Sequence, residues 1–398
     1  MHIGDSPDEA AFRAEARAWL TDNAAPRSGG ESMHHDDLAA HVAACRQWQR
    51  TLFDHGWAGI PWPKAFGGRG GTSLQASIFG EEQGAFSVSA GAFAVGIGMV
   101  GPTLMAHGTP EQQQRYLQGM LRGDDVWCQL FSEPGAGSDL AALATRAVRD
   151  GDEFVINGQK VWTSLGQFAD FGILLARTNP DVPKHRGITY FIVDMRTAGI
   201  EVRPLVQMTG TAHFNEVFLT DVRIPAANVV GEIDNGWKVT HTTLTSERAF
   251  IGGGNGTWNV GALIDLAKAN GTVDDPSIRQ SLMRAYTRAA AMTYLGFRLR
   301  TAASQRRMPG PEMFIMKLAY ARHWAATMET AMQVVGAEAM LTSEPSNVWG
   351  QYFLSQYAIR LGGGTDEVQA NIIAEQGLGL PREPSNDRDV PWKDLARS

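Results

Sequence analysis

Residues 127–140 read WCQLFSEPGAGSDL, an apolar run that breaks into a loop of proline, glycine and serine. The apolar run predicts a strand, and the loop after it leaves the backbone bare at Gly135 and Gly137. Backbone N–H groups there and the hydroxyls of Ser132 and Ser138 can approach a polar or anionic group directly. The spacing matches neither G-x-G-x-x-G nor G-K-[ST]. The residues alone therefore leave two readings about equally open, a ligand loop after a strand and a plain glycine-rich turn.

Short apolar runs separated by turn residues continue from this stretch to about residue 230. They lie at 154–156, 173–175, 188–193 and 217–219. Short strands with tight turns predict an antiparallel β domain, which we place at 126–234.

Apolar residues fall at helical spacing on both sides of the predicted β domain. Phe12, Ala16 and Trp19 form one such stripe. Two stripes near the other end are Leu282, Tyr286, Ala290, Tyr294 and Met316, Tyr320, Trp324, Met328. The expected fold is α+β, with an N-terminal all-helical domain at 1–125 and a C-terminal four-helix bundle at 235–398. Residues from about Glu383 onward are expected to form a polar tail.

Composition excludes several functional classes. The 398 residues carry a formal net charge of -7 with scattered Lys and Arg, so we expect no nucleic-acid binding. Cys45 and Cys128 are the only cysteines. They are too few for a disulfide framework or a zinc site, so we expect no metal and a reducing cytoplasm. Residues 84–110 contain no Asp, Glu, Lys or Arg, but their six Gly favour a closely packed buried helix over a membrane span.

Three segments in order resemble the acyl-CoA dehydrogenase family. Residues 127–140 resemble its flavin-contacting signature, 160–164 (KVWTS) its second flavin segment, and 361–369 (LGGGTDEVQ) its C-terminal glycine-threonine segment. The resemblance extends over nearly the whole chain. It implies the same helical, β and helical domain order, bound FAD, an acyl-CoA substrate, and an electron-transfer flavoprotein or similar acceptor.

The resemblance also implies roles for individual residues. Leu130 and Ser132 would reach the flavin ring edge, Trp162 would stack on the ring, and Ser164 would donate a hydrogen bond near the reactive nitrogen. The other implied contacts are Gly137 and Ser138 near the phosphates of the flavin or CoA, Gln333 and Gly336 near a neighbouring subunit's adenosine portion, and Thr365 and Glu367 at a helix start that suits a phosphate or ribose. The alternative for Trp162 is a strand aromatic that fills the core.

The catalytic base is where the chain departs from many family members. Gly363 occupies the position of their glutamate and has no side chain to titrate, although its N–H can still polarise a thioester carbonyl. An isovaleryl and long-chain branch of the family supplies its base from a Glu-Arg pair, which Glu247-Arg248 resembles. Glu247 shares a helical face with Leu244 and Ile251, where burial would raise its pKa toward that of a general base. The alternative is a solvent-facing glutamate paired with a cation. Arg248 is expected to be structural or near CoA.

No Arg-x-x-Phe-Gly segment, which in the family serves the flavin of a neighbouring subunit, is present after the first C-terminal helix. This resembles actinobacterial members in which two different chains share a flavin site, often for steroid side-chain thioesters. We therefore expect a homotetramer or an α2β2 heterotetramer.

The predicted reaction is FAD-dependent α,β-dehydrogenation to a trans-2-enoyl-CoA in the catabolism of fatty acids or steroid side chains. Two alternatives stay open: an acyl-CoA or nitroalkane oxidase of the same fold, and a partner subunit of a heteromeric dehydrogenase. The sequence also leaves open the length and branching of the acyl group, because the 84–105 helix and the glycines at 252–256 both bear on pocket depth.

Overall fold

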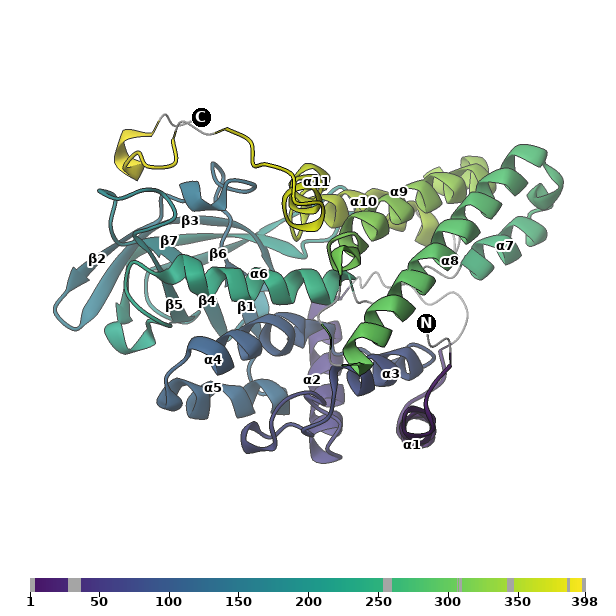
Figure 1. Ribbon diagram of the computed structural model, residues 1–398, viewed down its shortest axis with the longest axis horizontal. Coiled ribbons are helices and arrows are strands. Elements are labelled where there is room, and N and C mark those ends of the chain that lie inside the picture. Colours follow the sequence, from purple (N-terminus) through teal and green to yellow (C-terminus); the bar gives the residue numbers. More distant parts are fainter. Residues whose placement is uncertain are drawn as a thin grey trace. The chain divides into compact units, whose positions relative to one another are not determined.

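The structure is a computed structural model that describes residues 4–27, 37–252, 260–305, 307, 310–341, 347–384 and 387–395. Its residues group into two compact units (Figure 1). The first unit contains α1, α3 and α7 to α11; the second contains α2, α4, α5, all the strands, α6 up to Glu247 and the C-terminal residues 387–395. The predicted order of helical, β and helical segments is confirmed. The predicted boundaries at 125 and 234 stay predictions.

Seven strands of the second unit form one sheet in the order β1-β4-β2-β3-β7-β6, with β5 paired to β4. Their bounds are β1 (Trp127–Leu130), β2 (Arg146–Asp150), β3 (Glu153–Ser164), β4 (Phe171–Arg177), β5 (Ile188–Asp194), β6 (Ile200–Leu205) and β7 (Phe214–Pro225). Each run predicted to be a strand lies in one of them. The sheet is mainly antiparallel as predicted, but β1 runs parallel to β4, with Leu130 opposite Leu174.

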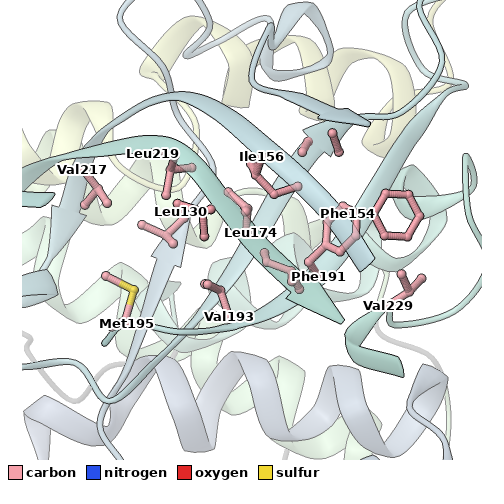
Figure 2. Packing of buried hydrophobic residues seen from close by; sticks show 14 of the residues in the cluster. Leu130, Phe154, Ile156, Leu174, Phe191, Val193, Met195, Val217, Leu219 and Val229 are labelled. Atoms are coloured by element: carbon pink, nitrogen blue, oxygen red, sulfur yellow. The ribbon is translucent and has the colours of Figure 1, made fainter. Parts of the chain in front are cut away.

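The core of the second unit lies against this sheet. Strands β4 and β5 are buried along almost their whole length, whereas β7 alternates between buried and more exposed residues. Figure 2 shows Leu130 among Leu174, Val217 and Leu219 in the core cluster. Burying each such side chain stabilises the fold by roughly 1.5–3 kcal/mol.

Helices of the second unit are α2 (Leu38–Asp54), α4 (Gly101–His107), α5 (Pro110–Arg122) and α6 (Gly236–Gly252). Helix α5 begins with a capping box in which Thr109 and Gln112 bond reciprocally, and it ends at Gly123 in the left-handed conformation. A Cβ at Gly101 would lie 2.0 Å from the Trp62 ring, so this glycine permits the close packing predicted for 84–110. No described helix is long and apolar enough to cross a membrane.

The first unit is built from helices. They are α1 (Pro7–Asn23), α3 (Ser73–Gln83), α7 (Val260–Ala269), α8 (Pro276–Ser304), α9 (Met316–Val335), α10 (Asn347–Leu361) and α11 (Asp366–Ile372). Helices α7 to α10 share one core, as predicted for a four-helix bundle. Part of the predicted α8 stripe is wrong, because Tyr286 and Tyr294 are exposed and Ala285 and Met292 are buried instead. Because an α-helix has about 3.6 residues per turn, positions spaced by four move gradually around the helix axis. Over the 29 residues of α8, such positions therefore leave the buried face.

Candidate active site

The glycine loop lies open to solvent. Gly135, Gly137 and Ser138 are all exposed, and no atom lies within 4 Å of the place where a Cβ of either glycine would be. Neither glycine has a left-handed backbone. Glycine is therefore not required here by backbone conformation, and its effect is to leave the N–H groups accessible to a ligand.

A buried ion pair anchors the start of this loop. The Lys160 amino group lies 2.8 Å from the Glu133 carboxylate and 3.0 Å from the Phe131 carbonyl oxygen. The same carboxylate accepts hydrogen bonds from the N–H groups of Ala144 and Thr145 at 2.7 and 2.9 Å. Burial opposes ionisation of Glu133, but Lys160 and these N–H donors hold its pKa below the ordinary value. Burial lowers the pKa of Lys160, and Glu133 partly offsets that effect. The start of the loop is thereby tied to β3, and Glu133 also holds the backbone just before β2.

Trp162 is exposed on a strand that otherwise packs into the sheet. Its side chain and backbone are 60% exposed, its φ is 62°, and it lies in a β-bulge between Lys160 and Thr163. A left-handed conformation costs a non-glycine residue roughly 1–2 kcal/mol. The ring has an edge contact with Phe214 at 6.0 Å between centroids. The alternative that Trp162 fills the core is therefore wrong, and an exposed aromatic ring is compatible with the predicted stacking, which stays a prediction.

Two of the matched segments lie side by side. The Val161 N–H donates to the Ser132 carbonyl oxygen at 2.9 Å, which joins β3 to the start of the loop. Ser132 and Ser164 are both partly exposed. Leu130, by contrast, is fully buried in the core and presents no surface to a ligand. The predicted contacts of Ser132 and Ser164 stay predictions, and that of Leu130 has no exposed surface to support it.

These residues fit a large planar cofactor that carries phosphate groups, such as FAD. The exposed face of Trp162 suits an aromatic ring, and the open N–H groups at Gly135 and Gly137 suit a polar or anionic group. Ser132 and Ser164 can add hydrogen bonds beside them.

Glu247 lies on α6 beside the strand that leads into the glycine loop. The Gln129 side-chain amide donates to the Glu247 carboxylate at 3.4 Å, and Gln129 immediately precedes Leu130. The Thr243 hydroxyl, one turn before Glu247, lies 2.9 Å from that of Thr103 and 3.1 Å from that of Tyr190. Helix α6 is thus fixed against α4 and β5, and Glu247 is partly buried. The raised pKa expected for Glu247 stays a prediction.

In the first unit, the predicted glycine-threonine segment forms a tight turn before α11. Gly363 and Gly364 have φ values of 67° and 92°, which residues with a side chain rarely adopt. Gln369 donates to the Gly363 carbonyl oxygen at 2.7 Å, and Lys317 to that of Gly364 at 2.6 Å. Thr365 caps α11 by accepting from the Val368 N–H. The turn is held by side chains whose role the sequence did not indicate.

The remaining predicted residues of this unit are accessible. Glu367 is exposed, and hydrogen bonds from its own N–H and from Thr365 at the helix start lower its pKa. Gln333 and Gly336 are exposed where α9 ends, and Arg248 is partly buried. Their predicted roles, like that of Gly363, stay predictions. Of the glycine cluster 252–256, residues 253–256 lie outside the described residues.

Sequence reasoning missed Gln129 and the pair of Glu133 and Lys160. A partial signal for the pair was present, because Lys160 directly precedes the apolar residues Val161 and Trp162 and Glu133 is the only acid in the loop before Asp139. A charge at a buried strand position requires a partner nearby. Gln129 had no such signal, because its contact depends on where α6 crosses the sheet.

Comparisons with known proteins identify the family of the chain. Family models of the acyl-CoA dehydrogenase N-terminal, middle and C-terminal domains match residues 6–124, 128–222 and 234–378. Acyl-CoA dehydrogenase IpdE1 of Mycobacterium tuberculosis is 39% identical over 383 residues, covering 94% of this chain and 98% of that protein.

Among solved structures, the Tcur3481-Tcur3483 steroid ACAD matches with a TM-score of 0.82 and 32% identity over 96% of this chain and 100% of that one. The ChsE4-ChsE5 complex from M. tuberculosis matches with a TM-score of 0.80, 32% identity and the same coverage. With three family models in order along one chain, and with an open glycine loop beside an exposed tryptophan, this protein belongs to the acyl-CoA dehydrogenase family and is an oxidoreductase of the CH–CH class.

Proposed function

We propose that the protein is an FAD-dependent acyl-CoA dehydrogenase that converts an acyl-CoA thioester to the trans-2-enoyl-CoA. The observation that carries the proposal is Trp162, exposed and strained beside the glycine loop, on the same sheet whose first strand contacts Glu247 through Gln129. Strain of this kind persists where surrounding structure enforces it, and it clusters at functional sites.

Each residue has a definite task in this reaction. Glu247 takes the α-proton at its carboxylate, and the Gly363 N–H stabilises the charge that develops on the thioester oxygen. Bound FAD supplies the acceptor for the β-hydrogen, which leaves as hydride. Trp162 would hold the flavin by stacking, and Ser132 and Ser164 would add hydrogen bonds to it. Ser138 and Arg248 serve the CoA portion, and Gln333, Gly336, Thr365 and Glu367 serve the flavin's adenosine and phosphate portions.

The proposed substrate is a bulky, steroid-linked acyl-CoA. Support comes from the similarity to the Tcur3481-Tcur3483 steroid ACAD, and from the missing Arg-x-x-Phe-Gly segment. The similar ChsE4-ChsE5 structure is a complex, which supports a heteromeric assembly, and we propose an α2β2 heterotetramer here in preference to a homotetramer. Electrons pass to an electron-transfer flavoprotein or a similar carrier. Flavin copurifying at one per subunit with this chain alone would contradict the shared site.

The Glu247→Gln variant tests the assignment of the base. It keeps the shape of the side chain and its contact with Gln129, so flavin content should be unchanged. Turnover with an artificial electron acceptor should fall by about 10²–10⁴-fold, the usual effect of removing a general base. Glu232→Gln is the matched control, because Glu232 also accepts from a side-chain amide, that of Asn235 at 3.3 Å, but is exposed. Near-normal turnover in Glu247→Gln would exclude Glu247 as the base.

A panel of thioesters tests the substrate class. Straight-chain acyl-CoA thioesters of increasing length and a steroid-linked acyl-CoA are compared by kcat/KM, with the chain expressed alone and with a candidate partner chain. A preference of about 100-fold for the steroid-linked thioester is expected if a pocket is built for a large apolar group. Equal kcat/KM across the panel would contradict the steroid assignment without affecting that of Glu247.

A further inference from the structure

Residues 387–395, which we call the C-terminal strap, are attached to the second unit. The backbone N–H of Trp392 donates to the Val182 carbonyl oxygen at 2.8 Å, and the backbone N–H of Lys393 donates to the Pro180 carbonyl oxygen at 3.1 Å. Pro391 forms a β-bridge with Pro183. The strap is the yellow segment beside the strands in Figure 1. The predicted polar tail is therefore wrong for these residues: backbone hydrogen bonds and the Trp392 ring attach them. The matched family models end at residue 378, before the strap begins.

Trp392 reaches the turn that follows the glycine loop. Its indole N–H donates to the Ala142 carbonyl oxygen at 3.1 Å, and Ala142 ends the 3-10 turn Leu140–Ala142. That turn begins directly after Asp139, the last residue of the loop. The strap is thus hydrogen-bonded to the backbone at Ala142, four residues after Ser138.

The Trp392 ring also packs against Arg177, which holds the same turn. The guanidinium carbon lies 4.6 Å from the ring centroid. Arg177 is buried and donates to the carbonyl oxygens of Ala141 at 2.6 Å and Leu143 at 3.2 Å. Burial lowers the pKa of Arg177 to about 10, so it remains charged at neutral pH. A charged guanidinium over an indole face is favourable, so the ring contact helps to hold Arg177 in place.

A second connection between strap and loop runs through Lys184. Its amino group lies 2.9 Å from the Asp139 carboxylate and 3.0 Å from that of Asp387. Burial opposes the charge on Lys184, but the two carboxylates raise its pKa. Asp387 belongs to the strap and Asp139 to the loop, so Lys184 bridges them. The strap therefore acts on residues 139–143 at two separate points.

We propose that the C-terminal strap is a positioning element for the glycine loop. It fixes the C-terminal end of the loop through Trp392 and Asp387, while the Glu133–Lys160 pair fixes the other end. Gly135, Gly137 and Ser138, which lie between the two anchors, stay exposed to a ligand. That this ligand is a flavin or a CoA thioester rests on the proposed function; the coupling of strap to loop does not.

Hydrogen exchange of the full-length protein tests the coupling without any ligand. Compared with wild type, Trp392→Ala and a chain ending at residue 384 should exchange the backbone amides of residues 137–144 about tenfold faster, because local opening costs less once a hydrogen bond and a ring contact are lost. Trp392→Phe keeps a ring against Arg177. In this variant and in Asp387→Asn, the amides of residues 137–144 should exchange only about twofold to fivefold faster than in wild type. The control is Lys393→Ala, whose amino group pairs with Asp181 and not with the loop or its holders.

Two results of this experiment would overturn the proposal. One is unchanged exchange at 137–144 in the shortened chain. The other is faster exchange spread evenly over β4 and β5, which would mean that the strap only adds general stability.

A flavin-binding measurement on the same proteins separates this inference from the proposed function. The Kd for FAD should rise about tenfold in the shortened chain and stay unchanged in Lys393→Ala, with the partner chain present where flavin binding requires it. A wild-type protein that binds no flavin contradicts the proposed function and leaves the exchange result standing. Faster exchange with an unchanged Kd would show that the strap orders the loop without positioning it for flavin, and that part of the proposal would fall.

Discussion

Strands β1 and β3 place their tryptophans in opposite environments. Trp127 is 1% exposed and its ring contacts Tyr116 and Phe171, whereas Trp162 is 60% exposed and has a T-shaped contact with Phe214 alone among these rings. Strand β3 also reverses the usual burial of charged and aromatic residues, because Lys160, two residues before the exposed Trp162, is fully buried. A strand that buries a charge and exposes an aromatic ring is not organised for stability alone. Buried Trp127 and Lys160 stabilise the fold around the site, whereas the exposed Trp162 is accessible to a ligand.

Trp127→Ala should have the largest effect on stability. It removes a buried ring from a three-ring cluster, so the free energy of unfolding should fall by about 3–5 kcal/mol. Urea unfolding followed by circular dichroism measures this. A loss below about 1 kcal/mol would show that Trp127 is no more a core residue than Trp162.

Lys160→Met should lower the free energy of unfolding by about 3 kcal/mol, measured in the same way. The change leaves the Glu133 carboxylate buried without its cation, which is more damaging than losing a contact between neutral groups. Lys160→Met combined with Glu133→Gln should recover part of the loss, since the double variant has no unpaired charge. Additive losses in the double variant would show that the two residues act separately.

Glu133 should also make stability depend on pH. Its folded pKa is depressed, so the stabilisation is fully present above the ordinary carboxyl value of about 4.5 and is lost as the pH falls through the folded pKa. Unfolding free energy of wild type should therefore fall more steeply below about pH 4.5 than that of Glu133→Gln. Parallel pH profiles of the two proteins would contradict the assignment.

Trp162→Gly should have the smallest effect on stability and a large effect on binding. Glycine adopts a φ of 62° without strain, so unfolding free energy should change by less than about 1 kcal/mol, in either direction. Flavin retention should fall strongly. The matched variant is Trp127→Phe, which keeps the core filled and should leave flavin binding intact. A loss of stability at Trp162→Gly as large as that at Trp127→Ala would remove the contrast between the two strands.

The sequence predicted the parts of this molecule that depend on local patterns. Short apolar runs located β3, β4, β5 and β7, and the glycine loop was identified because an apolar run breaks there into proline, glycine and serine. The family resemblance implied an accessible Trp162, but residue spacing could not show how it becomes exposed: a bulge shifts the alternation within β3 between Lys160 and Thr163. The spacing also did not predict that Tyr286 and Tyr294 leave the bundle core. The contact of Gln129 with Glu247 depends on how β1 and α6, which are far apart in the sequence, pack in the fold. The spacing of residues along the chain cannot predict such a contact.

The buried pair of Glu133 and Lys160 has a consequence for how this chain can diverge. The two residues lie 27 positions apart, and replacing either one alone leaves an uncompensated charge inside the protein. Intermediates that carry a single replacement are therefore selected against, even where both end points would fold. We expect the two positions to be exchanged together among relatives or retained together, so that co-variation between them marks the chains whose glycine loop is anchored in this way.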